Sequence, residues 1–215
     1  RFSSMPEPTL PATERLLSDQ PWHIVPRTDT RVLDPRYGFR VDVPEHLYDF
    51  GEVHNLLVAR GTLTAEERFK INEHIIQTII MLESMPFPKS MRRVPEYAGE
   101  HHETLLGEGY PRKKTLDQLS IPSRIMAIAD IFEALTASDR PYKKAKTLSE
   151  SVRLLATFRD RQHIDAELFE LFLTSGVYQR YADRFLEPWQ IDAVDIREYL
   201  RHPGDGEVPD HQKEE

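Results

Sequence analysis

The stretch SIPSRIMAIADIFEALTA, residues 120–137, decides the fold of this chain. Ser120 and Pro122 form a start typical of a helix, and apolar side chains then follow on almost every side of the helical wheel. A helix that is apolar all round belongs in the centre of a protein. Asp130 lies in the middle of this run, and a buried carboxylate needs a cation or hydrogen-bond donors beside it. The sequence therefore predicts a central helix in which the Asp130 side chain faces something positive.

Other segments predict helices on both sides of this one. Thr64 and Glu67 form a capping box, and the helix that follows should turn one apolar face inward. That face comprises Ile71, His74, Ile75, Thr78, Ile79 and Leu82. Further helices are expected at about 45–61, 88–102, 148–158, 165–175 and 188–200. The predicted fold class is all-α, a helical bundle.

A proline-rich, partly extended N-terminal arm should precede the bundle. Seven of the sixteen prolines fall within the first fifty residues, which makes long helices there unfavourable. Residues 22–25 and 39–43 could pair as two short strands. We expect an arm or insertion over 1–46, a helical domain over 47–200 and a disordered tail over 201–215. Because the chain starts at Arg1 without Met, it is expected to be a piece of a longer protein.

Composition excludes several classes of function. The 215 residues carry 28 Lys and Arg against 36 Asp and Glu, so no general positive field exists to hold a long nucleic acid. No apolar run is long enough to span a membrane and no secretory signal is present, so a soluble, cytoplasmic location is expected. The absence of cysteine excludes disulfides and thiolate ligands. Metal ligands must therefore come from His, Asp and Glu.

Four residues are candidates for a metal site: His74, His101, His102 and Asp130. The intervals from His74 to His101 and from His102 to Asp130 are 27 and 28 residues, and each fits a helix, a turn and a helix. Residues spaced in this way can meet in the core of an antiparallel bundle. Imidazole and carboxylate ligands suit Fe, Mn or Zn, and such a cluster can hold the two ions used in phosphoester cleavage.

Structural alternatives exist for these residues. A single inward histidine such as His74 is commonly a hydrogen-bonded core residue. Adjacent residues on a helix point about 100° apart, so His101 and His102 face one ion together only at a helix end or bend. His46 and His54 are more consistent with surface or packing roles. Asp130 is the stronger indication of a metal, because burial of a carboxylate is costly.

Four ordered motifs resemble the HD-GYP family, a branch of the HD-domain metal-dependent phosphohydrolases. They are Leu63-Thr64 with the downstream His74, His101-His102-Glu103 with Gly109-Tyr110-Pro111, the run from Arg124 to Asp130, and Asp139-Arg140-Pro141-Tyr142. They cover about 63–155. Characterised members of the family hydrolyse the bacterial second messenger cyclic di-GMP, which implies a cyclic dinucleotide substrate here.

The resemblance also implies roles for individual residues. His74, His101, His102 and Asp130 match metal ligands, and ions of Fe or Mn are favoured over a structural Zn. Arg140 and Lys143 match cations that bind the diester phosphate, although a structural turn is an equal interpretation of Arg140. Tyr110 could offer a face for guanine. The Gly-Tyr-Pro loop also implies docking on a cyclase-type (GGDEF) partner domain.

One departure from the family is large. Members carry an earlier His-Asp pair, and this chain contains no His-Asp dipeptide. The nearest match, Tyr48-Asp49, has Tyr in place of His. Either the pair lies upstream of Arg1, which we favour, or the chain is a degenerate member that acts as a non-catalytic sensor or docking module.

Overall fold

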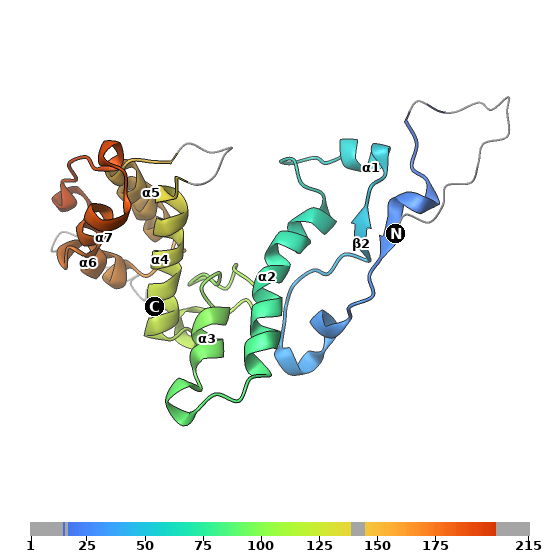
Figure 1. Ribbon diagram of the computed structural model, residues 1–215, viewed down its shortest axis with the longest axis horizontal. Helices are drawn as coiled ribbons and strands as arrows, with labels where there is room; N and C mark the ends of the chain where they lie inside the picture. The colour runs from blue at the N-terminus through green and yellow to red at the C-terminus, as the bar shows by residue number, and fades with distance from the viewer. Residues whose placement is uncertain (1–14, 16, 139–144, 201–215) are drawn as a thin grey trace, which may run out of the picture. The chain divides into compact units, whose positions relative to one another are not determined.

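The computed structural model describes residues 15, 17–138 and 145–200, and these form two compact units, Arg1–Gln118 and Leu119–Glu215 (Figure 1). Helices dominate the described residues, which confirms the predicted all-α class. The boundary between arm and helical domain at 46/47 stays a prediction. The tail expected over 201–215 lies outside the described residues.

In the first unit, the two main helices are α2, Ala65–Glu83, and α3, Val94–Gly99. The capping box of Thr64 and Glu67 starts α2 as predicted. The predicted inward face is wrong in part, because Ile71 and His74 are exposed. The apolar side chains that α2 buries are Phe69, Ile75, Ile76, Ile79 and Ile80. The buried face is rotated from the predicted one because the arm covers it with Val32 and Tyr37.

The helix predicted over 88–102 is shorter than expected. A 3-10 helix, Lys89–Met91, precedes α3, and Pro95 stands in the first turn of α3. A Cβ on Gly99 would lie 2.6 Å from Cγ1 of Ile79, so α3 can approach α2 this closely only with glycine there. Because α3 ends at Gly99, the residues after it form a turn.

The arm contains a two-stranded antiparallel sheet, but with a different partner from the predicted one. Strand β1, Ile24–Pro26, pairs with β2, His46–Asp49, and not with 39–43. The helix predicted over 45–61 is also wrong apart from α1, Glu52–Leu56. Three hydrogen bonds keep this segment extended. The Phe50 amide donates to the His23 carbonyl, and the Arg27 side chain donates to the Pro44 and His46 carbonyls. Short 3-10 helices lie at Pro21–His23, Arg31–Leu33, Pro35–Tyr37 and Leu116–Gln118.

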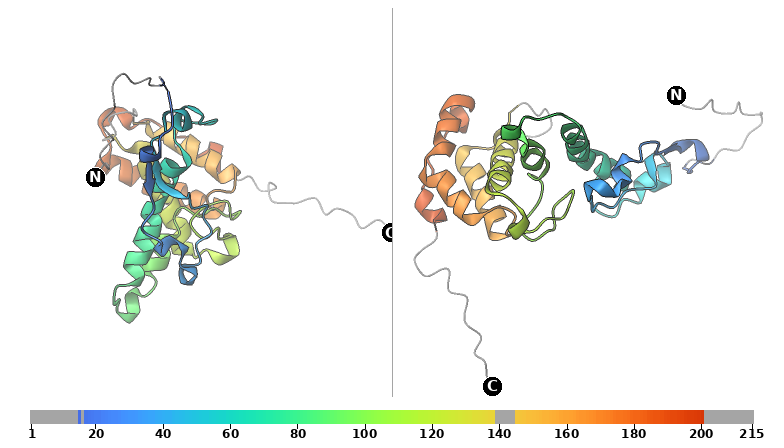
Figure 2. Two further views of the ribbon diagram at one scale, coloured as in Figure 1. Left: turned by 90° about the vertical axis from the view of Figure 1, so that its right-hand side faces the viewer. Right: turned by 90° about the horizontal axis from the view of Figure 1, so that it is seen from below.

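The described part of the second unit contains four α-helices, drawn from yellow-green to red in Figures 1 and 2. They are α4, Ile121–Thr136; α5, Leu148–Asp160; α6, Ala166–Thr174; and α7, Val177–Phe185. Their shared core includes Phe132, Leu155 and Phe169. The helix α4 matches its predicted bounds, but Ile125 and Met126 are exposed, so α4 is not buried on every side.

The end of the second unit differs from the prediction. The helix α7 was not predicted, and the helix expected over 188–200 is wrong. Gly176 adopts a positive φ of 68° between α6 and α7, so the two helices separate there. Only 3-10 helices follow, at Pro188–Gln190 and Ile196–Tyr199. None of the helices in 15–200 that the structure describes combines the length and apolarity needed to cross a bilayer.

Candidate metal centre

Three histidines of the first unit converge. His74 projects from α2, whereas His101 and His102 lie in the turn directly after α3. One ring nitrogen from each lies within 4.8 Å of the other two, and the Nε2 atoms of His74 and His102 are 3.1 Å apart. The early end of α3 is what lets two adjacent histidines face the same point.

Backbone carbonyls orient two of the rings. Nδ1 of His74 lies 2.6 Å from the Ile71 carbonyl oxygen, and Nδ1 of His101 lies 2.9 Å from that of Ala98. A carbonyl only accepts, so Nδ1 is the donor in each contact, and in a neutral ring this tautomer has its lone pair on Nε2. Metal-binding histidines are commonly held by a partner of this kind. Because His74 is exposed, the alternative that it is a core residue is wrong.

The loop over 107–111 packs on this cluster. The Tyr110 ring stacks on the His102 ring, with centroids 4.8 Å apart and planes 22° from parallel. The Tyr110 amide also donates to the His102 carbonyl at 3.2 Å. A Cβ on Gly109 would lie 2.5 Å from both Glu103 Cα and the His102 oxygen. The glycine is therefore required for the loop to reach the histidine turn.

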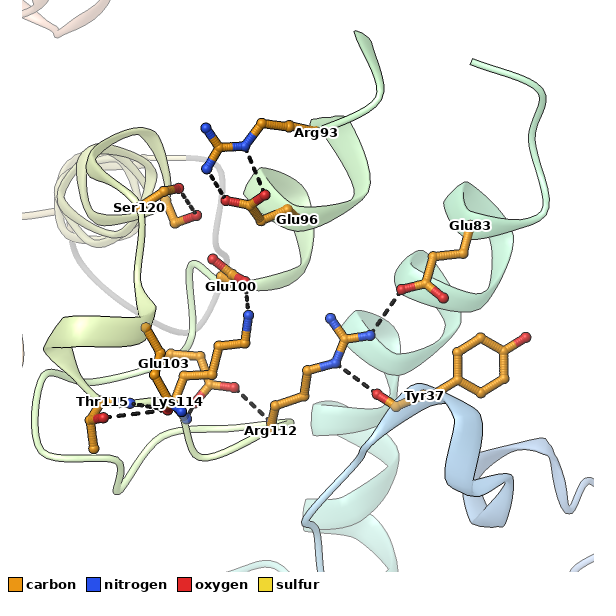
Figure 3. A network of polar contacts seen from close by, with 12 residues as sticks. Tyr37, Glu83, Arg93, Glu96, Glu100, Glu103, Arg112, Lys114, Thr115 and Ser120 are labelled. Carbon is orange, nitrogen blue, oxygen red and sulfur yellow. Dashed lines mark hydrogen bonds and ion pairs between the residues drawn. The ribbon is translucent and has the colours of Figure 1, made fainter. Parts of the chain in front are cut away.

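A buried glutamate fixes the chain after the loop. Glu103, only 2% exposed, accepts hydrogen bonds from the amides of Arg112 at 2.6 Å and Lys114 at 2.9 Å (Figure 3). Burial raises the pKa of Glu103, while these two amides act in the opposite direction. Glu103, the residue directly after His102, thus holds the backbone just beyond the loop.

Two side chains extend this network to other elements. Lys114 forms an ion pair with the buried Glu100 at the end of α3. Arg112 donates to the Tyr37 carbonyl at 2.8 Å and to Glu83 at 2.9 Å, which joins the loop to the arm and to the end of α2 (Figure 3). No role for Arg112 or Lys114 could be predicted from their positions in the sequence. Glu103, which follows the histidine pair directly, was the one available signal.

The other predicted ligand and the phosphate-binding residues have numbers within the second unit. Asp130 is half-buried on α4 of the second unit, so its role as a ligand stays a prediction. Arg140 and Lys143 lie outside the described residues, and so does the turn that was the alternative for Arg140. Asp49 lies in β2 and accepts from the Gly51 amide at 2.8 Å. His54 lies beside Glu66 at 3.3 Å, a local contact that fits the structural role expected for it.

Comparisons with known proteins agree on one family. A family profile described as HD domain matches residues 11–168. A 3'3'-cGAMP-specific phosphodiesterase of Vibrio cholerae is 34% identical over 148 residues, which are 65% of this chain and 33% of that protein. A cyclic di-GMP phosphodiesterase of Pseudomonas aeruginosa is 38% identical over 79 residues, 36% of this chain and 18% of that protein. One of Thermotoga maritima is 32% identical over 145 residues, 64% of this chain and 39% of that protein. The chain thus spans well under half the length of these relatives.

Proposed function

Because this chain belongs to the HD-domain family, and within it to the HD-GYP branch, we propose that it acts as a metal-dependent phosphodiesterase on a cyclic dinucleotide. Cyclic di-GMP is the first candidate substrate, and 3'3'-cGAMP is the second because relatives carry that name. The observation that carries the proposal is the convergence of His74, His101 and His102. An imidazole triad beside a glycine-rich loop suits a divalent ion and a phosphate ester.

The donor set fits a transition-metal ion. Nitrogen ligands bind such ions at about 2.1 Å, so two nitrogens on one ion lie at most about 4.2 Å apart. The 3.1 Å between Nε2 of His74 and Nε2 of His102 is within that limit, whereas the three ring nitrogens together lie within 4.8 Å of one another, so all three would reach one ion only after a small approach of the rings. We assign His74, His101 and His102 as ligands and Asp130 as a fourth. Fe or Mn is the preferred identity, because the ligands are nitrogen and oxygen with no thiolate.

The residues of the candidate site would then have the following roles. The Ile71 and Ala98 carbonyls orient the rings of His74 and His101 through Nδ1, so that Nε2 would be the atom that binds an ion. When bound, a divalent ion polarises a phosphodiester and lowers the pKa of bound water towards neutrality. Arg140 and Lys143 are proposed to bind the diester phosphate, the former through two parallel hydrogen bonds. Tyr110 stacks on His102 and is proposed to contact the substrate.

Docking of the Gly-Tyr-Pro loop on a cyclase-type domain is proposed as a secondary interaction. Gly109, Tyr110 and Pro111 belong to a loop that is tied to its surroundings on both sides by Glu103 and Arg112. A loop held in this way keeps one shape, which favours recognition by a partner. We propose that the chain is cytoplasmic and meets such a partner in the cytoplasm.

A metal and turnover assay tests the proposal. The chain is loaded with Mn²⁺ or Fe²⁺, its metal content is measured, and hydrolysis of cyclic di-GMP and 3'3'-cGAMP is followed by chromatography. We expect His101→Ala to lower metal affinity at least about tenfold and to lower hydrolysis with it. The control is His46→Ala, since His46 contributes its carbonyl, not its ring, to the contact with Arg27; this variant should behave like the unchanged chain.

Two outcomes would reject the proposal. Full metal content and turnover in His101→Ala would remove the histidine cluster from the mechanism. A chain that takes up no metal at micromolar concentration would favour the alternative, a non-catalytic docking or sensor module. Comparison of the two substrates decides which cyclic dinucleotide is preferred.

A further inference from the structure

His101 and His102 stand at the two central positions of a turn, residues 100–103, which we call the histidine turn. The Glu103 amide donates to the Glu100 carbonyl at 2.9 Å, and this hydrogen bond closes the turn directly after α3. The two corner residues fix the path of the backbone between them. The direction in which both imidazoles project therefore depends on how Glu100 and Glu103 are held.

Both corner residues are buried glutamates. Glu100 and Glu103 are each 2% exposed, and burial of a carboxylate is costly unless a donor or a cation faces it. Glu103 accepts from the Arg112 amide, and Figure 3 shows both carboxylates in contact with the segment that follows the loop. Contacts with this segment, residues 112–114, thus hold the two ends of the histidine turn.

Lys114 contacts both corners at once. Its ammonium forms an ion pair with Glu100, and its backbone amide donates to Oε2 of Glu103 at 2.9 Å (Figure 3). The side chains of Lys114 and Glu100 are 27% and 1% exposed, so water screens this ion pair less than a pair on the surface. One residue therefore bridges the two ends of the histidine turn.

The preceding lysine has a different environment. Lys113 is exposed, and within the described part of the chain its ammonium has no ion pair or hydrogen bond. Neither lysine belongs to the four motifs that the sequence shares with the HD-GYP family. The two adjacent residues therefore form a matched pair, in which only the side chain of Lys114 is tied to the histidine turn.

We propose that Lys114 is a positioning residue of the metal centre, which holds the histidine turn through Glu100 and Glu103 so that both imidazoles face one ion. The assignment rests on the proposed function, since it takes His101 and His102 as ligands. A turn that is ordered before the ion arrives lowers the entropic cost of binding. Only the small approach of the three rings is then left for the ion to bring about.

The Mn²⁺ affinity of matched lysine variants tests this role. The full chain is freed of metal with a chelator, and Mn²⁺ is titrated by calorimetry. Lys114→Met removes the ammonium but keeps the backbone amide, and it should weaken Mn²⁺ binding about tenfold, as loss of an outer partner of a metal ligand does. Lys113→Met is the matched control and should bind Mn²⁺ as the unchanged chain does. Lys114→Arg retains a cation for Glu100 and should keep most of the affinity.

A double variant separates positioning from a loss of stability. Lys114→Met leaves the buried Glu100 without this cation, which lowers stability in addition to freeing the turn. Glu100→Gln removes the uncompensated charge. The double variant Lys114→Met/Glu100→Gln should therefore recover the denaturant midpoint of the unchanged chain in large part, while its Mn²⁺ affinity stays low. Recovery of both together would overturn the proposal, because the loss of affinity would then follow from stability alone.

Hydrogen exchange of the metal-free chain gives a second readout. The Glu103 amide, which closes the histidine turn, should exchange faster in Lys114→Met than in Lys113→Met. Equal exchange in the two variants would overturn the proposal, and so would equal Mn²⁺ affinity.

The outcomes also separate this proposal from the proposed function. If Lys114→Met loses Mn²⁺ affinity as expected but the loaded chain hydrolyses no cyclic dinucleotide, the positioning role stands and the phosphodiesterase fails. If the unchanged chain takes up no Mn²⁺, the metal centre fails and the positioning role fails with it. Hydrolysis with equal metal affinity in both lysine variants would leave the phosphodiesterase and reject the role of Lys114.

Discussion

The two units of the chain are stabilised in different ways. The core of the second unit consists of apolar side chains such as Leu148, Val152, Leu155 and Phe169, all with 0% exposure. The first unit has a smaller apolar core and buries four glutamates in addition, Glu66, Glu73, Glu100 and Glu103. Apolar packing is non-directional, whereas hydrogen bonds and ion pairs fix particular groups at particular places. The unit that holds the histidine cluster therefore buries more carboxylates than the second unit, which buries Asp165 in an ion pair with Arg124.

The polar contacts of the first unit act on irregular segments. Glu103 and Glu100 hold the chain at 112–114, and Glu73 forms an ion pair with Arg27 of the arm at 3.7 Å. Loops and arms have no regular hydrogen-bond ladder of their own, so side chains must satisfy and position their backbone. We therefore expect substitutions in the core of the second unit to lower the free energy of unfolding, and substitutions in the polar network of the first unit to alter the geometry of the histidine cluster.

The largest expected effect is loss of a core side chain in the second unit. Phe169→Ala should lower the free energy of unfolding by about 3–5 kcal/mol, because it removes a fully buried aromatic ring and leaves a cavity. Leu171→Ala, on the exposed side of α6, should change it by less than about 0.5 kcal/mol. Denaturant unfolding measures both variants. Equal losses would mean that α6 does not pack as described.

Two glycine variants separate an effect on the histidine cluster from an effect of backbone strain alone. Gly109→Ala should cost about 1–3 kcal/mol because its Cβ would overlap the Glu103 and His102 backbone. The displaced turn should also lower metal affinity, by about tenfold. Gly38→Ala introduces strain at a positive φ of 65° with nothing within 4 Å, so it should cost about 1–2 kcal/mol and leave metal affinity unchanged.

Unfolding and metal titration of the two glycine variants separate these effects. If Gly109→Ala binds metal as well as Gly38→Ala does, the loop does not hold His102 in position. If both lose metal affinity, the arm around Gly38 has more influence on the cluster than its contacts indicate.

Local signals in the sequence predicted the helices better than the arm. The capping boxes at Thr64 and Thr147 and the apolar run of α4 depend on residues a few positions apart, so they can be recognised from sequence alone. The pairing of β1 with β2 depends on residues about twenty apart, and the alternating pattern over 39–43 offered an equally plausible partner. Register between distant strands is set by tertiary contacts that the pattern does not contain.

The candidate site shows the same difference between local signals and long-range contacts. Motif spacing indicated His74, His101 and His102 as a group, and the structure places them within 4.8 Å. The sequence did not indicate that α3 ends early enough to turn both adjacent histidines to one point. Nor did it indicate that Arg112 binds the Tyr37 carbonyl, a contact across 75 positions. Contacts between residues so far apart in sequence depend on how the arm folds, and the strand pairing predicted for the arm was wrong.

The smallest expected effects come from two equivalent caps, one in each unit. Thr64→Ala and Thr147→Ala each remove the hydroxyl that accepts from the amide three residues later, at 3.2 Å and 3.3 Å. Loss of such a cap costs about 1 kcal/mol. The start of α5 has additional support, because Asp192 accepts from both the amide and the hydroxyl of Ser149, at 2.7 Å and 2.6 Å.

We therefore expect Thr64→Ala to be the more damaging of the two. Hydrogen exchange should show faster opening of the first turn of α2 in Thr64→Ala than of α5 in Thr147→Ala, because Asp192 still accepts from Ser149 after the change at α5, whereas the change at α2 also removes a donor to the buried Glu66. A larger loss in Thr147→Ala would mean that Asp192 does not support α5 in solution.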